Sequence, residues 1–494
     1  MKFKTKVAYS AVLATLSLAA GTAQAAYLSE QGTGQVLLYP YYTVQGGMDT
    51  YVSVVNTTSR AKAVKVRFIE GRGSFEVLDF NLYLSAYDVW NAAVTTTDAA
   101  STTAGAKIVT TDKSCTAPGI PAGGQAFRNS AYTPVNVGQA QLGTGMDRTR
   151  EGYVEIIEMG VPDNSRAVNK TNTFEWSVTH NSAGVPNDCA WVQNQFAGLP
   201  INVLAPSSLA TTTRTGGLIG TGTLINTKDG VDYSYDPVAI EDFNSTNKPL
   251  HYTPGSTNPS LADAETTSAI IDGVSSNRHL LTTDWTTNGN GGTAGLDAIS
   301  AVLMRSNVMN EYTINADLKA GTDWVVTFPT KRLYVGQNDQ GASTFQTTRP
   351  FTKGGGDFKG SSWLACEPAV FTRYNREEAV KGGSIDFSPS TTVGTSLCYE
   401  SNVITFSNKN VLGSVNVKNN IDDVFADGWI DLSFMAPGQS MTARAATNTP
   451  DIEATYVGLP VIGFAVQKYV DDRFNGAVGN YGGSFAHKYV RTIR

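Results

Sequence analysis

Apolar and polar side chains alternate along much of the first 200 residues of the chain. Residues 63–69 read AVKVRFI, which places three apolar side chains on one face and Lys65 and Arg67 on the other. A period of two is the pattern of a β-strand with one buried face, and β-branched residues favour a strand over a helix. The segment therefore predicts a strand with one face exposed to solvent.

Similar runs are separated by turn residues such as Gly46-Gly47 and Asn56-Thr57. They cover residues 35–44, 51–55, 75–84, 152–158 and 174–179. Short strands at this spacing predict an antiparallel β-sandwich, either immunoglobulin-like or jelly-roll-like. Residues 91–145 are rich in Thr, Ala and Gly, and we expect them to form a long loop that is held at Cys115.

The pattern changes between residues 205 and 322. Residues 261–274 and 296–308 have the apolar spacing of short helices, with Ile299 and Val302 on one face of the second. We expect a mixed α/β segment with two or so short helices that pack against a sheet.

The β pattern returns at residues 324–335, which read WVVTFPTKRLYV, with Pro329 at a sheet edge or a bend. Further strands are predicted over residues 369–374, 402–406, 414–417, 428–434 and 455–466. The fold class is therefore mainly β. The expected division is a leader (1–25), an N-terminal sandwich domain (26–204), the mixed segment (205–322) and a β-rich region (323–494) that packs with the N-terminal sandwich.

The N-terminus has the three parts of a secretory signal peptide. Lys2, Lys4 and Lys6 form a cationic region, residues 7–20 are apolar, and residues 23–25 read Ala-Gln-Ala. Cleavage is expected before Ala26. The apolar run is too short to span a bilayer, and no later segment is apolar for 18 residues. The sequence thus predicts general secretion to the outer surface, the medium or the periplasm, with no transmembrane segment after cleavage.

The net charge and the charged fraction of the chain bear on which partners it can bind. Loss of the three leader lysines changes the formal net charge from −6 to −9, and only 16% of residues are charged. Nucleic acid requires a basic face, and so does electrostatic attachment to anionic lipid. The composition argues against both.

Four cysteines follow the leader: Cys115, Cys189, Cys366 and Cys398. An even number in an oxidising compartment predicts disulfides. Three pairings are possible, and we favour Cys115 with Cys189 and Cys366 with Cys398. A metal site is disfavoured because the spacing is wrong for zinc and no histidine lies close to a cysteine pair.

The sequence contains no catalytic motif. His180, His251, His279 and His487 lack metalloprotease spacing, and no G-x-S-x-G nucleophile elbow is present, although a Ser-His-Asp set from distant residues stays open. The run from Gly216 to Gly222 lacks the Lys-Ser/Thr ending of a phosphate-binding loop. We interpret it as a glycine-rich strand or turn, and the protein as non-enzymatic.

A carbohydrate site would combine carboxylates with aromatic rings. The candidate carboxylates are Glu155, Glu158, Glu367 and Asp431. The candidate rings are Tyr39, Tyr41, Tyr42, Trp90, Trp191 and Trp363. Ordinary core packing is the more common role of such rings, and the sequence does not place any two carboxylates together.

No cofactor is expected, although two acidic loops are weak candidates for calcium, which binds several loop oxygens. The first contains Asn226, Asp229, Asp232 and Asp236. The second contains Asp422, Asp423 and Asp427. Neither follows an EF-hand or a known calcium repeat, so solvated turns are the simpler interpretation.

Over most of its mature length the chain resembles uncharacterised secreted cell-surface proteins of Gram-negative bacteria. The similar segments are YYTVQGGMDTYVSVVNTT, KAVKVRFIEGRGSFEVLDFNLYLSAYDVW, GTLINTKDGVDYSYD, DWVVTFPTKRLYV and YVGLPVIGFAVQKYV. The resemblance implies a surface or secreted location. It includes no catalytic motif and so implies no functional residue.

Together these features predict a secreted, non-enzymatic structural protein of the cell surface or an extracellular layer. Unpaired sheet edges permit lateral association, so self-association or contact with cell-envelope components is expected. Two alternatives remain open: a carbohydrate-binding protein or glycosidase, and an adhesin that presents its loops to another cell.

Overall fold

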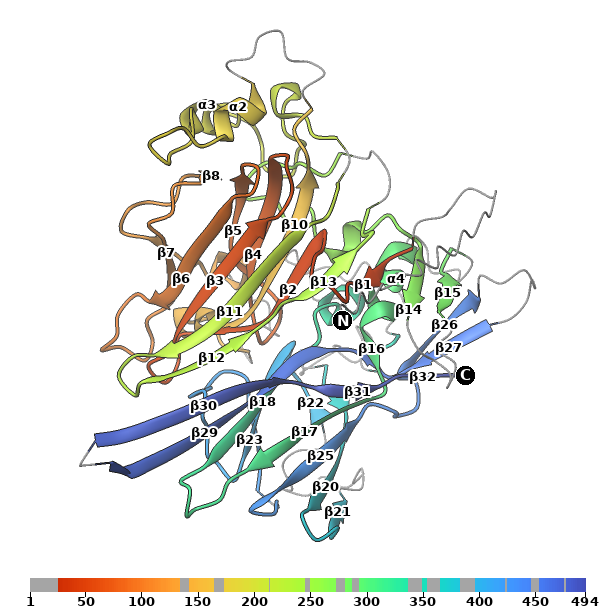
Figure 1. Ribbon diagram of the computed structural model, residues 1–494. Coiled ribbons are helices and arrows are strands. Elements are labelled where there is room, and N and C mark those ends of the chain that lie inside the picture. The colour runs from red at the N-terminus through yellow and green to blue at the C-terminus, as the bar shows by residue number, and fades with distance from the viewer. Residues whose placement is uncertain are drawn as a thin grey trace, which may run out of the picture.

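Two β-sandwiches, one built mainly from each half of the chain, form most of the structure (Figure 1). The computed structural model describes residues 25–133, 142–163, 173–212, 214–244, 249–271, 280–286, 293–335, 349–352, 365–382, 396–422, 424–445, 453–474 and 477–494. The fold is mainly antiparallel β, as the sequence predicts. Residues 1–24 of the predicted leader lie outside the described part.

The first sandwich consists of a seven-stranded and a six-stranded sheet. The seven-stranded sheet has the order β1 (Tyr27–Leu28), β13 (Val238–Glu241), β2 (Val36–Thr43), β10 (Glu151–Gly160), β4 (Lys62–Glu70), β5 (Glu76–Leu84) and β8 (Cys115–Ala117). The six-stranded sheet has the order β12 (Val231–Tyr235), β11 (Leu218–Asn226), β3 (Asp49–Asn56), β6 (Val89–Thr96), β7 (Ala106–Val109) and β9 (Gln125–Ala126). Val64, Val66 and Phe68 of β4 face Val52 and Val54 of β3 in one core, as the period of two requires.

The second sandwich also has two sheets. One has the order β24 (Lys418–Ile421), β23 (Ser401–Phe406), β18 (Gly321–Thr327), β29 (Ile462–Phe474) and β30 (Ala477–Ala486). The other has the order β21 (Val380–Gly382), β20 (Val370–Asn375), β25 (Asp427–Ser433), β17 (Asn307–Thr313) and β31 (Lys488–Val490). The sheet that contains β18 is buried on both faces. Trp324 faces the β17 sheet, whereas Val325 and Val403 pack into the core of the first sandwich.

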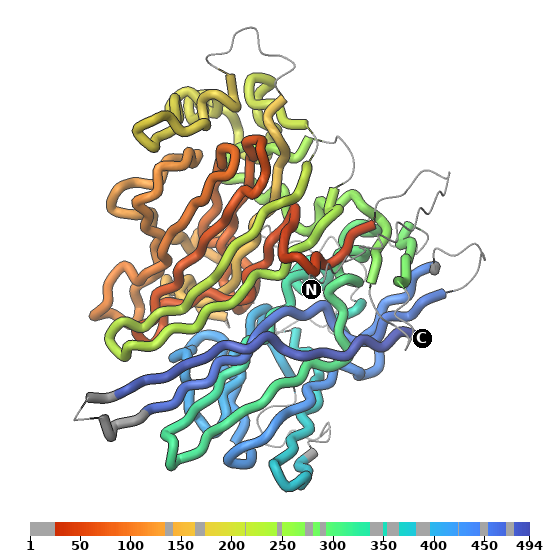
Figure 2. The backbone as a smooth tube through the Cα atoms, in the orientation of Figure 1, coloured from red at the N-terminus to blue at the C-terminus, as the bar shows by residue number. Residues whose placement is uncertain are grey.

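A fifth sheet joins the two ends of the described chain (Figure 2). Its order is β14 (Ser268–Ile271), β15 (Leu281–Asp284), β26 (Ser440–Ala445), β27 (Glu453–Val457) and β32 (Thr492–Ile493). Ala26 forms a parallel bridge to Ala269 at the β14 edge, and β32 forms the opposite edge. Two short ladders complete the sheets: β16 (Met304–Arg305) pairs with β28 (Leu459–Pro460), and β19 (Glu367–Pro368) pairs with β22 (Ser396–Leu397).

The helices in the described part are α2 (Phe174–Val178), α3 (Cys189–Asn194), α4 (Ala294–Leu303) and α5 (Lys331–Val335). Short 3-10 turns cover Ser130–Tyr132, Met146–Arg150, Ser207–Leu209 and Leu261–Asp263. The helix α4 packs against the β14 sheet. Gly295 lets α4 also approach the 3-10 turn at Leu261–Asp263, because a Cβ there would meet the carbonyl oxygen of Ala264 at 1.8 Å.

Several expectations for the helices were wrong. Residues 174–179 form α2 instead of a strand, because Thr173 caps the first turn and Phe174, Ser177 and Val178 share one buried face at helical spacing. The expected helix at 261–274 is a single 3-10 turn followed by β14, where pairing with β15 determines the conformation of residues 268–271. The second expected helix ends at Leu303, and β17 begins at Asn307.

The expected loop at 91–145 was also wrong, since β6, β7, β8 and β9 lie within or across it. Ala92, Val94, Ala106 and Ile108 are buried between the sheets, so small side chains suffice here and few large ones mark the strands. Residues 205–322 do not form a separate segment: β11–β13 complete the first sandwich and β17 and β18 belong to the second. After Pro329 the chain turns into α5, and residues 414–417 form a connection instead of a strand.

Both disulfides join neighbouring cysteines along the chain. Cys115 of β8 is bonded to Cys189 of α3, which fixes the α2–α3 segment to the first sandwich. Cys366 is bonded to Cys398 beside the β19–β22 ladder.

Buried charges connect the two sandwiches. Glu155 of β10 accepts from Arg67 of β4 at 3.4 Å and from Arg332 of α5 at 3.3 Å, and all three side chains are buried. Glu151, also on β10, accepts from the Ser414 hydroxyl at 2.6 Å and from the Val415 backbone N–H at 2.9 Å. Because removing one partner would leave an uncompensated buried charge, loss of either side chain of such a pair destabilises the docked arrangement.

Replacing Glu155 with Gln tests this connection. The variant removes the buried negative charge that Arg332 faces across the junction, so we expect the free energy of unfolding to fall by about 3 kcal/mol. Glu175→Gln is the control, because its partner Arg60 is half exposed, and we expect a loss of about 1 kcal/mol or less. Urea unfolding at neutral pH measures both, and equal losses would contradict the role of Glu155.

The buried carboxyl of Glu400 predicts a dependence of stability on pH. Burial raises the pKa of Glu400 to about 7, although Lys331 and Arg332 oppose this shift. The unfolded chain releases this proton near pH 4.3, so the folded state holds one more proton between about pH 4.3 and 7. Glu400 therefore contributes stability below about pH 4.3 that is lost as the pH rises to about 7.

We expect Glu400→Gln, which mimics the protonated form, to be more stable than the wild type at pH 8 by up to about 3 kcal/mol, and similar to it at about pH 4.5. Urea unfolding at several pH values measures the difference. Glu30→Gln, at an exposed position, is the control and is expected to show no such trend. A difference for Glu400→Gln that does not change with pH would refute the assignment.

Candidate functional site

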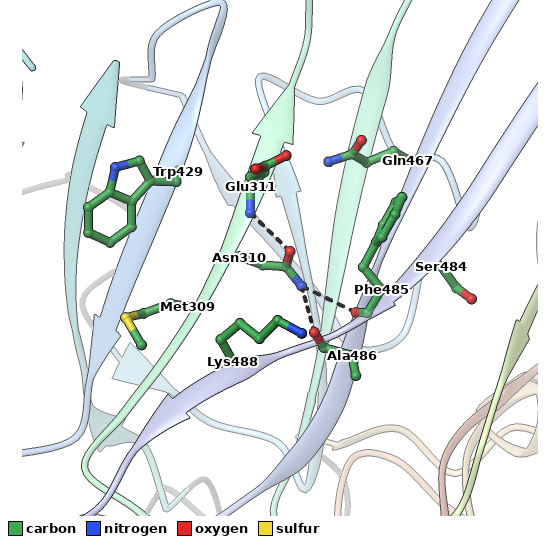
Figure 3. Close-up of a pocket in the computed structure, with 9 residues that line it drawn as sticks. All are labelled: Met309, Asn310, Glu311, Trp429, Gln467, Ser484, Phe485, Ala486 and Lys488. Carbon is green, nitrogen blue, oxygen red and sulfur yellow. Dashed lines mark hydrogen bonds between the residues drawn. The ribbon is translucent and has the colours of Figure 1, made fainter. Parts of the chain in front are cut away.

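A groove lies where the chain crosses from β30 in one sheet of the second sandwich to β31 in the other (Figure 3). Its volume is about 660 Å³, within the usual range for small-ligand sites. The lining residues are Met309, Asn310, Glu311, Trp429, Gln467, Ser484, Phe485, Ala486 and Lys488. They come from β17, β25, β29, β30 and β31, so the groove exists only when both sheets are assembled.

The floor of the groove depends on Asn310. Its side-chain amide donates to the carbonyl oxygens of Phe485 at 3.2 Å and Ala486 at 3.4 Å, as Figure 3 shows. The same amide lies 3.3 Å from Nδ1 of His487, whose Nε2 lies 3.0 Å from the carbonyl oxygen of Val325. Burial lowers the pKa of His487 to about 4, so its ring is neutral, with Nε2 donating and Nδ1 accepting. These bonds fix the crossover beside β17.

One wall of the groove is aromatic. Trp429 is 38% exposed and stacks on Tyr374 of the neighbouring strand, with ring centroids 4.3 Å apart and planes 10° apart. Antiparallel register places Glu311 opposite Trp429 on the other side. Phe485, 47% exposed, points into the groove from β30 (Figure 3). Apolar ring surface thus lies next to an exposed carboxylate.

A second hollow of about 420 Å³ continues the groove, since it shares Glu311, Trp429 and Gln467 with the first. It extends to Asp427, whose carboxylate accepts from Thr313 Oγ1 at 2.7 Å.

Tyr469 lies in this second hollow and donates to Gln467 Oε1 at 2.8 Å. Burial raises the pKa of Tyr469, and the charges of Asp427 and Glu311 raise it further. Two carboxylates therefore influence one phenol, and the hollow combines several hydrogen-bonding groups with a ring.

This combination suits a polyhydroxylated ligand. The ring of Trp429 offers an apolar face, while Glu311, Asp427 and Gln467 offer oxygens that accept from hydroxyl groups. Asp431, two residues after Trp429, is oriented by a 2.7 Å hydrogen bond from Asn307. Asp431 is not among the residues that line either hollow, and the other three candidate carboxylates also lie elsewhere.

Glu155, Glu158 and Glu367 are fully buried and have partners inside the fold. Glu158 pairs with Lys62 at 2.7 Å, and Glu367 accepts from the Thr352 backbone N–H at 3.0 Å. None of the three lines either hollow, so these carboxylates stabilise the fold.

The candidate rings also belong to the core. Tyr39, Tyr41, Tyr42 and Trp90 are buried between the sheets of the first sandwich, and Trp191 is half-buried near the first disulfide. Trp363 lies outside the described residues, as does His279. Sequence reasoning missed Trp429, Tyr374 and Glu311.

The alternation of apolar and polar residues around Trp429 could have indicated these residues. The predicted strand at 428–434 places Ile430 and Leu432 on one face and Trp429 and Asp431 on the other. A tryptophan on the polar face of a strand indicates a surface ring.

The structure does gather one Ser-His-Asp set. Nδ1 of His180 lies 3.1 Å from Ser85 Oγ and 3.5 Å from Asp88 Oδ2. In a hydrolytic triad the serine and the carboxylate contact different ring nitrogens, so that a proton can pass from one side to the other. Both partners share Nδ1 here, which does not fit that mechanism. His251 is buried against Tyr83, with its pKa lowered by burial to about 4.

The calcium candidates are dispersed. Asn226 accepts from the backbone N–H of Asp229, whose carboxylate lies 3.4 Å from Lys468 Nζ. Asp232 and Asp236 are exposed on and just after β12. No group of three or more metal-ligating His, Cys, Asp or Glu side chains occurs among the described residues.

The second acidic loop is dispersed too. Asp422 accepts from Asn420 at 2.6 Å, and Asp427 faces the groove. Asp423 lies outside the described residues.

The glycines from Gly216 to Gly222 lie just before β11 and in its first half. They permit other side chains to pack closely against the backbone. A Cβ on Gly220 would lie 2.0 Å from the Tyr39 hydroxyl oxygen, and one on Gly222 would overlap the ring of Tyr235. The run is part of a strand and its approach, consistent with the sequence interpretation.

Comparison of the chain with protein-family models, with curated proteins and with solved structures finds no match in any of the three. Within the described residues, no helix is long and apolar enough to cross a membrane.

Proposed function

We propose that this chain is an exported, non-enzymatic protein of the cell surface that binds carbohydrate in the groove of its second sandwich. The observation that carries the proposal is the exposed ring of Trp429, stacked on Tyr374 and flanked by the carboxylate of Glu311. A ring held by a second ring loses little freedom on binding, so it can pack against the apolar face of a sugar.

The groove favours glycan binding over a purely structural role. A structural sheet face needs no hollow, whereas this one combines two hollows with amides, carboxylates and rings from five strands. The proposal retains the surface location, which the leader-like N-terminus and the two disulfides support.

Two features support binding without hydrolysis. Most carboxylates considered for catalysis are paired inside the fold, and the Ser85–His180–Asp88 set has the wrong arrangement for acyl transfer.

Trp429→Ala tests the proposal. We expect the wild-type chain to bind at least one class of oligosaccharide on a glycan array, and the variant to bind it about thirtyfold more weakly, because a central ring at a binding site is worth about 2 kcal/mol. Titration calorimetry with the best ligand measures the change.

Tyr51→Ala is the matched control. This ring is 49% exposed but lies on β3 of the first sandwich, so its loss should leave the affinity unchanged. Thermal unfolding of both variants checks that the fold is intact. Failure of the wild type to bind any glycan, or equal affinities for wild type and Trp429→Ala, would refute the proposal. Release of reducing sugar from the ligand would refute its non-enzymatic part.

A further inference from the structure

Residues 173–212 form a small cap on the first sandwich. The cap includes α2 and α3, which lie at one end of the sandwich beside β8 (Figure 1). Its apolar side chains share a core cluster with residues of β4, β5, β8 and β10, and this cluster is separate from the cores of the two sandwiches. The disulfide between Cys115 and Cys189 links the cap covalently to β8.

The ring of His251 lies between the cap and the sheet, and this residue is 2% exposed. The ring stacks on Phe174 of α2, with planes 15° apart, and makes T-shaped contacts with Tyr83 of β5 and with Phe196 at the end of α3. The backbone carbonyl of His251 also accepts from the Ala205 N–H of the cap at 2.7 Å. The imidazole therefore contacts the cap and the sheet at the same time.

Both ring nitrogens of His251 are used in this contact. Nδ1 lies 2.9 Å from the carbonyl oxygen of Leu209, which can only accept, so Nδ1 carries the proton. Nε2 lies 3.0 Å from the Tyr83 hydroxyl and accepts its proton, while the hydroxyl oxygen accepts from the Asn81 amide at 3.3 Å. A second proton on Nε2 would face this hydroxyl, which would then lose its acceptor. The arrangement therefore fits the neutral imidazole and opposes the charged one.

The groups around the ring add to this preference. Burial, and the positive charge of Lys65 on β4, lower the pKa of His251 to about 4, although its hydrogen bond to a backbone carbonyl opposes the shift. The Lys65 ammonium pairs with Asp79 of β5 at 2.8 Å. Burial raises the pKa of Tyr83, so the hydroxyl of this residue keeps its proton. The aromatic rings from α2 and from the end of α3 carry no charge.

The attachment of the cap therefore depends on pH. A solvated histidine has a pKa near 6.5, so the detached cap binds a proton on His251 more readily than the attached cap. Attachment is fully stabilised above about pH 6.5 and weakens as the pH falls to about 4. His180 of the cap acts in the opposite direction, because its Nδ1 lies 3.5 Å from the Asp88 carboxylate. This contact is partly exposed to solvent, so its effect is smaller.

We propose that acid releases the cap: protonation of His251, whose ring is enclosed between α2 and β5, detaches residues 173–212 from the first sandwich. The Cys115–Cys189 disulfide keeps the released cap attached to β8. The sheets stay folded, because their own cores hold them. Release exposes the apolar residues that cap and sandwich share, so the protein presents an apolar surface at this end only in acidic surroundings. The inference is independent of the groove.

Hydrogen exchange measured by mass spectrometry, corrected for the intrinsic dependence of exchange on pH, tests the release. Between about pH 7.5 and 4.5 we expect the protection factors of α2 and α3 in the wild type to fall at least about tenfold, and those of β2 and β10 to change about twofold or less. In His251→Gln, whose side chain stays neutral, α2 and α3 should also change about twofold or less. Unchanged protection of the wild-type cap, an equal fall in His251→Gln, or simultaneous loss of protection in β2 and β10 would overturn the proposal.

His180→Gln is the matched control, because it removes the other histidine of this contact, and it should show at least the wild-type fall; loss of the fall in this variant would overturn the proposal. A second measurement needs no variant. Nitrogen-15 NMR distinguishes His251, which is protonated on Nδ1, from His487, which is protonated on Nε2. The His251 ring should become charged over the same pH range in which the cap loses protection. Charging of this ring while the cap stays protected, or loss of protection while the ring stays neutral, would also contradict the proposal.

Discussion

The central strand β10 carries the interaction on which the assembly depends. All ten of its residues are buried, yet Glu151, Glu155 and Glu158 are among them. A carboxylate in this position needs charged or hydrogen-bonding partners, and two of the three have partners in both halves of the chain. Glu155 pairs with Arg67 and Arg332, and Glu151 accepts from Tyr41 and Ser414. The second sandwich therefore supplies part of the hydrogen bonding that these buried carboxylates require.

Docking in turn explains why the β18 sheet has two buried faces. Phe464 of β29 stacks on Tyr235 of β12, with ring centroids 4.5 Å apart, while Trp324 of β18 packs on Phe406 toward the other sheet. Because this sheet is held on both sides, the β30–β31 crossover has a fixed position. The fixed position of this crossover determines the shape of the groove beside Asn310, although the lining residues of the groove come from strands other than β10.

The sequence was sufficient for the fold class and for several strands of the second half, among them β18, β20, β23 and β25, because runs of β-branched and aromatic residues mark them. It failed where small residues form strands, as at Ala92 and Ala106, and where sheet pairing overrides a helical pattern, as at Ser268–Ile271. The groove was out of reach for a different reason. Tyr374, Trp429 and Glu311 come from three strands, and only their register, which depends on the assembled sheet, brings them together.

The structure also shows where the few charged groups of the chain lie. Many of its charged groups are inside, in pairs such as Lys62 with Glu158, and the outer face of the six-stranded sheet carries hydroxyl groups instead, with Thr223 and Ser234 bonded across strands at 3.0 Å. A surface of hydroxyls interacts weakly with polyanions and with anionic lipid. At Glu311 an exposed carboxylate lies beside the ring of Trp429, so the groove combines an apolar face with strong hydrogen-bond acceptors.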